Sequence, residues 1–228
     1  MQKEMTVTKL TAAGTTATLF GVLAGAGGMV HGVGEILQGN VAPEGLIINS
    51  WTEGPIATNM GGEPGMTIVP NLLVTGVLTF LFSLAVLVWA ALFVRRRHGG
   101  RILIVLSLGM LLVGGGFGPP LIGILAGVAG TQSGEPQRGW HRRLPAGGQR
   151  LLARLWPFVF GVAAVAGTFL VIGSLILVYL FGVDNADLFL NTFYVTVLSL
   201  AFTVLAAPAY DGRVAERGAP VLGYSDGD

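Results

Sequence analysis

Long apolar segments, separated by short polar ones, occupy most of this sequence. A helix that crosses a bilayer needs about 20 mainly apolar residues, and four segments meet that length: residues 11–37, 67–94, 155–183 and 188–207. Charged residues make up only 11% of the chain, against about 25% in soluble domains. So few charges could not cover a water-exposed surface, whereas a lipid-exposed surface needs none. The sequence therefore predicts an all-α polytopic membrane helix bundle, formed as a single domain by residues 1–210.

The positively charged residues lie on only some of the connecting segments. All thirteen lysines and arginines lie in the N-terminal residues, in Arg95–Arg101, in Arg138–Arg154, or at Arg213 and Arg217. The loop 38–66 and the turn Asp184–Asp187 contain none. Because segments rich in lysine and arginine stay on the cytoplasmic side, we expect a cell-membrane protein with both termini in the cytoplasm. The same rule places the basic loop 131–154 and a flexible tail over 211–228 in the cytoplasm, and the loop 38–66 outside.

This charge distribution requires the remaining apolar stretch, residues 102–130, to enter and leave the membrane on one side. Its middle is Gly114-Gly115-Gly116-Phe117-Gly118-Pro119-Pro120, so we expect a hairpin of helices 102–116 and 119–130. The first arm would be roughly 22 Å long, shorter than a hydrocarbon core of about 30 Å. Two interpretations are open: short full crossings, giving about six transmembrane helices, or the half-helices of a re-entrant loop. Six crossings are favoured, because tilt and local thinning of the bilayer tolerate a modest mismatch.

The tip of this hairpin is a candidate site. Glycine ends a helix in left-handed conformations, and proline suits the first turn of the next helix. If the tip lies within the membrane, the helix N-terminus there would present a positive dipole to an anion or a carboxylate. The alternative is a plain tight turn between two packed helices. The candidate residues of this broken-helix site are Gly114, Gly115, Gly116, Pro119 and Pro120.

Two ionisable side chains lie inside the first predicted helix, near its outer end. His31 and Glu35 are four residues apart, which places them on one face, and ionisable residues in membrane helices usually face the bundle and pair. The pair is a candidate for a structural hydrogen bond, a proton relay, part of a cation site, or a hydrated interfacial group. Polar residues recur at intervals of four on the second predicted helix. Of these, Asn71 and Thr75 are expected to extend the candidate site, through interhelical hydrogen bonds or as the lining of a polar pathway.

Small residues also form a pattern on the first predicted helix. Gly21, Gly25, Gly28 and Gly32 follow one another at spacings of four, three and four, so they form a narrow stripe along one face. Without side chains, such a stripe lets another helix approach closely. We therefore expect a helix–helix contact along it.

The predicted outer loop 38–66 carries acidic residues that are candidates for attracting cations. Glu53 and Glu63 are the candidate acids of this loop. The alternative is that they are simply solvated at the surface. Six glycines and three prolines in the loop argue against a regular helix through most of it.

Several kinds of chemistry are excluded by the residues that the chain lacks. The absence of cysteine excludes disulfides, thiolate catalysis, Cys-ligated zinc and iron–sulfur clusters. The sequence contains no Walker, HExxH or GxSxG motif, so no cofactor is predicted and an enzyme ranks last. A metal site is left open, because His31 and Glu35 supply two ligands whereas zinc usually takes at least three from the protein.

The polar features favour a transporter or channel for an ion or small solute. The alternative is a non-catalytic membrane subunit or scaffold, supported by the glycine-rich faces. Expected partners are membrane lipids, with anionic headgroups at the basic segments, and either a second copy of the chain or another membrane subunit. A net charge of +1 indicates no nucleic-acid partner.

Overall fold

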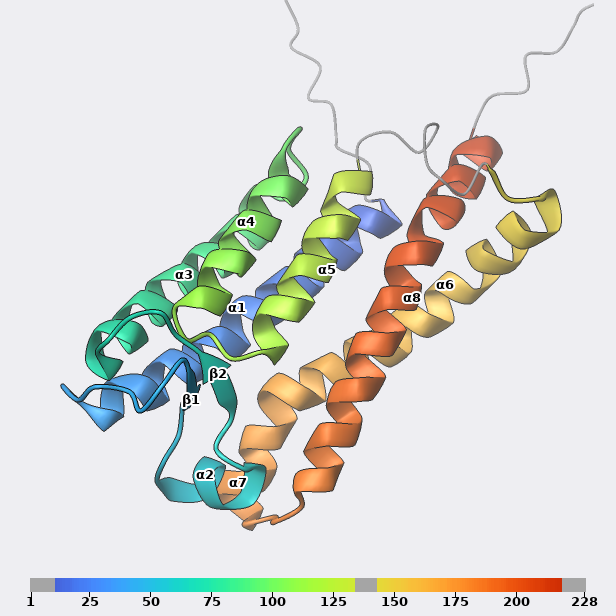
Figure 1. Cartoon of the computed structure of the whole chain (residues 1–228). Helices are drawn as coiled ribbons and strands as arrows, with labels where there is room; N and C mark the ends of the chain where they lie inside the picture. Colours follow the sequence, from blue (N-terminus) through green and yellow to red (C-terminus); the bar gives the residue numbers. More distant parts are fainter. Residues whose placement is uncertain (1–10, 134–142, 219–228) are drawn as a thin grey trace, which may run out of the picture.

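The computed structural model describes residues 11–133 and 143–218 (Figure 1). Apart from a short β-hairpin and the segments that connect the elements, these residues are helical. The elements in chain order are α1 (Ala12–Gln38), β1 (Ile47–Asn49), α2 (Gly54–Met60), β2 (Pro64–Met66), α3 (Leu72–Leu92), α4 (Gly99–Leu112), α5 (Gly118–Gln132), α6 (Ala146–Thr168), the π-helix η3 (Phe169–Gly173), α7 (Ser174–Phe181) and α8 (Ala186–Gly218). The predicted basic residues before Thr11 and within 134–142, and the end of the predicted tail after Gly218, lie outside the described residues.

Four helical segments are long and apolar enough to cross a membrane. They are α1, α3, the continuous 36-residue rod formed by α6, η3 and α7, and α8. The two arms of the hairpin, α4 and α5, have 14 and 15 residues. The all-helical, membrane-compatible fold class predicted from the sequence is thus confirmed.

The helices form two groups that lie side by side (Figure 1). In the first group α1 packs between α3 and α5, and α4 packs against both α3 and α5. The second group is the antiparallel pair of the α6–α7 rod and α8. The central position of α1 explains why its surface is the most buried of the four long helices.

The two ends of the bundle differ in the charged residues that they carry. At one end, here called the basic end, lie Arg95–Arg101, the start of α6 and the end of α8. At the other, here called the acidic end, lie the connection 39–71, the tip 113–117 and the turn 182–185. Among the described residues, the acidic end has no lysine or arginine, and its exposed or half-buried carboxylates are Glu44, Glu53, Glu63 and Asp184. Asp187 lies just beyond it, in the first turn of α8.

The glycine stripe of α1 makes the close helix contact that the sequence predicts. A Cβ atom built on Gly25 would lie 2.6 Å from Leu87 Cβ and 2.7 Å from the Ser83 carbonyl oxygen of α3. One built on Gly32 would lie 2.9 Å from the Gly76 carbonyl oxygen. Backbone contacts this short leave no room for a side chain, so α1 and α3 can pack together only because these positions are glycine.

A capping interaction joins the two helix groups at the basic end. Asp211 of α8 accepts hydrogen bonds from the first two backbone N–H groups of α1, Ala12 N at 2.6 Å and Ala13 N at 3.1 Å. The first N–H groups of a helix have no partner within it and favour a carboxylate. Ala12 and Ala13 also pack with Ala207, Trp156 and Tyr210. The C-terminal part of α8 is therefore tied to the start of α1.

This capping interaction explains why α8 ends later in the chain than the sequence predicts. Helix α8 continues beyond the predicted end at 207 to Gly218, so a flexible tail is wrong for residues 211–218. Packing of Tyr210 and the bonds of Asp211 hold this polar stretch in helical form. Helix α6 likewise begins at Ala146, inside the predicted basic loop 131–154, because a helix can extend beyond the apolar segment that hydropathy detects.

Candidate functional site

Four polar side chains from α1 and the acidic-end connection form a continuous hydrogen-bonded row. His31 Nε2 lies 2.8 Å from Glu63 Oε2, and His31 Nδ1 lies 2.9 Å from Ser50 Oγ. The Ser50 hydroxyl in turn donates to Glu35 Oε1 at 3.0 Å. We call Glu63, His31, Ser50 and Glu35 the polar chain. It joins the two predicted residues of α1 to one of the two predicted loop acids.

While Glu35 is ionised, the hydrogen bonds of the polar chain determine where its hydrogens lie. A serine hydroxyl has one hydrogen, and Ser50 directs it to Glu35. Ser50 can therefore only accept from His31, so His31 carries a hydrogen on Nδ1. On the other side of the ring, His31 Nε2 and Glu63 share one hydrogen, whose position follows from the charge of Glu63.

The β-hairpin formed by β1 and β2 brings Ser50 and Glu63 to α1. Strands β1 and β2 pair antiparallel with Ile48 opposite Gly65, and just beyond them the Ser50 N–H donates to the Glu63 carbonyl at 3.2 Å. Glu63 has a φ of 57° and is the one described non-glycine residue with a left-handed backbone. Such a conformation is unfavourable outside glycine and occurs most often at functional positions. Here it aims the carboxylate at His31.

Glu63 is half-buried, with 30% of its side chain exposed. Burial alone would raise its pKa, but the hydrogen bond and the electrostatic attraction of His31 outweigh burial and hold the pKa of Glu63 below its ordinary value. Glu63 therefore keeps its negative charge at neutral pH.

The glycine tip between α4 and α5 covers the other side of the polar chain. Gly114 has a φ of 116°, and a Cβ atom on it would lie 2.6 Å from both carboxylate oxygens of Glu35. Gly116 has a φ of 73°, and its Cβ would lie 2.5 Å from His31 Nε2. Only glycine combines this backbone with this closeness. The structure thus merges two sites that the sequence suggested separately, the His31–Glu35 pair and the broken-helix tip.

The tip ends inside the bundle rather than at the surface of the acidic end. The Val113 carbonyl accepts a hydrogen bond from Thr79 Oγ1 at 2.6 Å, and Thr79 lies seven residues after Leu72, or about 10 Å along α3. The connection folds over it, since a Cβ on Gly65 would lie 3.1 Å from the Gly114 carbonyl oxygen. Of the remaining tip residues, Gly115 packs on Met110, Pro119 lies near Gly27, and Pro120 is buried.

The other predicted site residues have different roles. Thr75 is buried, bonds Thr67 at 3.0 Å and packs beside Gly114, so it supports the tip. Asn71 accepts from Val74 N at 3.1 Å as the N-cap of α3 and donates to Asn40, away from the polar chain. Glu53 is exposed before α2. Ser50 was missed, because a single serine in a loop forms no pattern in sequence.

Glu35 is fully buried, and one of its oxygens is unusual. Oε1 accepts from Ser50, but Oε2 has no hydrogen-bond partner among the described residues. A buried unpaired carboxylate oxygen is costly and typically marks a functional group. Within residues 11–133 and 143–218, no three His, Asp or Glu side chains are grouped to hold a metal ion. Hydrogen-bonded histidine and carboxyl groups of this kind are able to exchange protons.

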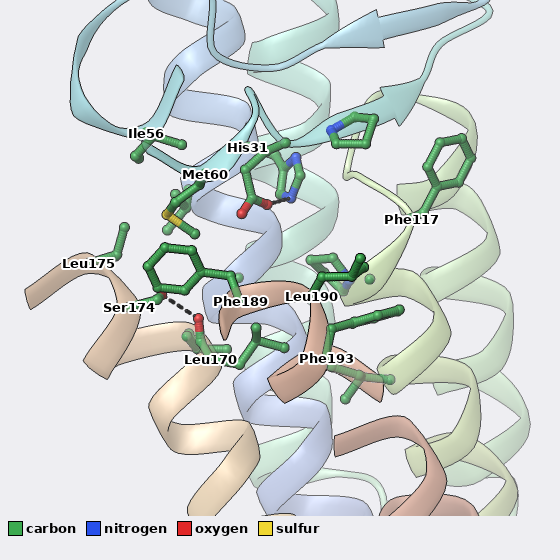
Figure 2. A pocket seen from close by; sticks show the side chains of 18 of the residues that line it. His31, Ile56, Met60, Phe117, Leu170, Ser174, Leu175, Phe189, Leu190 and Phe193 are labelled. Atoms are coloured by element: carbon green, nitrogen blue, oxygen red, sulfur yellow. Dashed lines mark hydrogen bonds and ion pairs between the residues drawn. The ribbon is translucent and has the colours of Figure 1, made fainter. Parts of the chain in front are cut away.

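A cavity of about 370 Å³ opens beside the polar chain, between the two helix groups (Figure 2). Its walls come from α1, α5, η3, α7 and α8, and α2 contributes Ile56 and Met60. His31 and Glu63 form part of its lining. The π-helix η3 contributes Leu170 and Val171 to the wall, and π-helical segments often occur at functional sites. No pattern in the sequence indicates this cavity, because its lining residues are scattered over six helical elements.

Comparison with models of protein families, with curated proteins and with solved structures finds no match to this chain. Its function is therefore argued from the site itself.

Proposed function

We propose that this chain is an integral membrane transporter that couples the movement of a small solute to the movement of protons. The observation that carries the proposal is the polar chain, because it links a cavity to a buried carboxylate through three consecutive hydrogen-bond contacts. Chains of ionisable groups inside membrane proteins commonly relay protons. The cavity supplies a place for the solute next to the first members of that chain.

The proposed proton step follows the bonds already formed. With the imidazole protonated at both nitrogens, the Nδ1 hydrogen of His31 moves to Ser50 Oγ while the Ser50 hydrogen moves to Glu35 Oε1. His31 becomes neutral with its remaining hydrogen on Nε2, and Glu35 becomes a neutral acid. One proton has then passed from the cavity edge to the interior, and no net charge has been created.

We also propose an orientation, with the basic end and both termini in the cytoplasm and the acidic end outside. The one-sided placement of arginine supports it. In this orientation the basic end would meet anionic lipid headgroups. In this arrangement the four long helices span the bilayer. The short hairpin α4–α5 reaches from the cytoplasmic side to a tip beneath the outer connection, which favours four spans plus a hairpin over six full crossings.

The scaffold alternative loses its main support in this structure. The glycine faces that suggested a partner surface are occupied within the chain. The α1 stripe packs on α3, and Gly100 of α4 packs against Gly127 and Gly130 of α5. A partner subunit would have to bind elsewhere.

Glu35→Gln tests the proposal, because glutamine keeps the shape of the side chain but cannot carry the proton. Purified protein is placed in liposomes that contain a pH-sensitive dye. Phenyltrimethylammonium, benzyl alcohol and benzenesulfonate are then added outside as a cationic, a neutral and an anionic solute. We expect one of them to change the internal pH with the unaltered chain, and Glu35→Gln to reduce that change to the level of protein-free liposomes.

Glu53→Gln is the matched control, since Glu53 is an exposed acid of the same connection and should leave the response unchanged. Ser50→Ala, which removes the bridge but keeps Glu35, should lose the response as well. Glu35→Gln behaving like the unaltered chain, or no solute changing the internal pH, would show that the polar chain does not couple protons to solute.

A further inference from the structure

We infer that the cavity binds a hydrophobic organic cation, such as a quaternary ammonium or phosphonium ion with aromatic or alkyl groups. That this cation is the transported solute rests on the proposed function. As a statement about binding, it stands on the cavity alone. The juxtaposition that carries it is an apolar cavity, here called the chamber, with carboxylates at its edge and, among the described residues, no lysine or arginine in its lining.

The chamber has the size and surface of a small-molecule site. At about 370 Å³ it lies in the range of about 300–1,000 Å³ that such sites occupy. Most lining side chains are aliphatic or aromatic, among them Leu23, Ile122, Leu175 and Leu190. A strongly hydrated ion would lose its water shell here without replacement. An ion whose charge is shielded by apolar groups would not.

The charged groups of the lining select for a positive ligand. They are Glu63, which stays negative, Asp187 in the first turn of α8, and His31, which is bonded to Glu63. The wider acidic end adds Glu44, Glu53 and Asp184, with no lysine or arginine among the described residues there. A surface of one sign concentrates ligands of the opposite sign. An anionic ligand would be repelled along its entire path.

Aromatic rings provide a second feature that suits a cation. Phe117, Phe189 and Phe193 come from the tip and from α8, and Figure 2 shows them around the chamber together with His31. The face of an aromatic ring attracts a cation, most strongly where water is excluded. Carboxylates at one edge and aromatic rings along the walls thus offer favourable contacts to both parts of an amphiphilic cation.

Cation binding would also promote proton transfer along the polar chain, from His31 toward Glu35. A positive charge beside Glu63 disfavours a second positive charge on His31. The imidazole would respond by passing its Nδ1 hydrogen toward Ser50 and Glu35. Binding of the cation and protonation of His31 would therefore oppose each other, which is a negative coupling between the cation and the proton at this site.

The test compares tetraphenylphosphonium with tetraphenylborate, two ions of the same shape and opposite charge. Their binding to the protein in lipid nanodiscs is measured by equilibrium dialysis, with empty nanodiscs subtracted to remove partitioning into lipid. We expect the phosphonium to bind at least about tenfold more tightly than the borate, and Glu63→Gln to weaken phosphonium binding about tenfold, the loss expected when one charged partner is removed. Asp187→Asn should weaken it in the same direction.

Two tryptophan variants of α7 locate the binding. Leu175 lines the chamber, whereas Leu180 is 74% exposed on the outside of the same helix. Leu175→Trp should fill the chamber and abolish phosphonium binding, and Leu180→Trp should leave it unchanged. Equal binding of both ions would indicate an apolar or lipid-tail site, and unchanged binding in Leu175→Trp would place the site elsewhere; either result overturns the inference.

The outcomes of this test are separable from those of the liposome assay. If the phosphonium fails to bind but a neutral or anionic solute changes internal pH through Glu35, the inference falls and the proposed function stands. If the phosphonium binds as expected but Glu35→Gln has no effect on proton movement, the chamber is a cation site and proton coupling falls.

Discussion

Gly116→Ala is expected to lower the free energy of unfolding by about 2–5 kcal/mol. Two effects add here. A left-handed backbone costs a non-glycine residue about 1–2 kcal/mol, and Gly116 has a φ of 73°. The new methyl group would also lie 2.5 Å from His31 Nε2, and forcing an extra group into a packed interior costs about 1–3 kcal/mol. Denaturant titration of the purified protein in detergent, followed by tryptophan fluorescence, measures the change.

Gly182→Ala separates these two effects. Gly182 has a left-handed backbone with a φ of 59°, but a Cβ atom there would meet nothing within 4 Å. The backbone effect alone remains, so we expect a loss of only about 1–2 kcal/mol. Equal losses in both variants would mean that the glycine tip does not lie against His31, and the merged site described above would be wrong.

The second large effect is expected from Gly25→Leu. This position faces α3 at backbone distance, with Leu87 N and the Ser83 carbonyl oxygen each 2.7 Å from an added Cβ. No side-chain rotation relieves a clash with backbone, so α1 and α3 would have to separate and the centre of the first helix group would be lost. We expect the variant to give no single folded species in detergent, as judged by size-exclusion chromatography.

Gly161→Leu is the matched control on α6. It is also a helical glycine in a long apolar helix, but an added Cβ would meet nothing within 4 Å. Leucine forms helices more readily than glycine, so this variant should be at least as stable as the unaltered chain. A well-folded Gly25→Leu protein would contradict the close contact of α1 with α3.

The helices could be predicted from sequence because their signal is local. A long run of apolar residues, such as that of α3, by itself indicates a helix in an apolar environment. The spacing of Gly25 and Gly32 identifies a packing face even when the partner helix is unknown. The hairpin α4–α5 could be predicted for a different reason, since the placement of arginine constrains both of its ends.

The site could be predicted only in part. His31 and Glu35 share one helix, so their spacing showed that they lie together, but the bond between them runs through Ser50, which is fifteen residues from Glu35 along the chain. Contacts of this kind depend on how the connection folds back, and no periodic pattern records that. The chamber could not be predicted from the sequence either, because its lining comes from helices of both groups and depends on how the two groups pack.

The proposed function requires that the chain is embedded in a membrane, and the proposed orientation places the acidic end outside. One labelling measurement tests both most directly. The native chain has no cysteine, so single cysteines can be introduced without a background. Glu53→Cys lies at the acidic end, His98→Cys at the basic end, and Val165→Cys on the long α6–α7 rod, where Val165 is 73% exposed. Each variant is treated in intact cells, and again after permeabilisation, with a membrane-impermeant maleimide.

We expect Glu53→Cys to react in intact cells and His98→Cys to react only after permeabilisation. Val165→Cys should stay unreactive in both cases, because lipid would cover its exposed side chain. Reaction of His98→Cys in intact cells would show that the orientation is the opposite of the proposed one. Reaction of Val165→Cys as readily as Glu53→Cys would contradict membrane embedding.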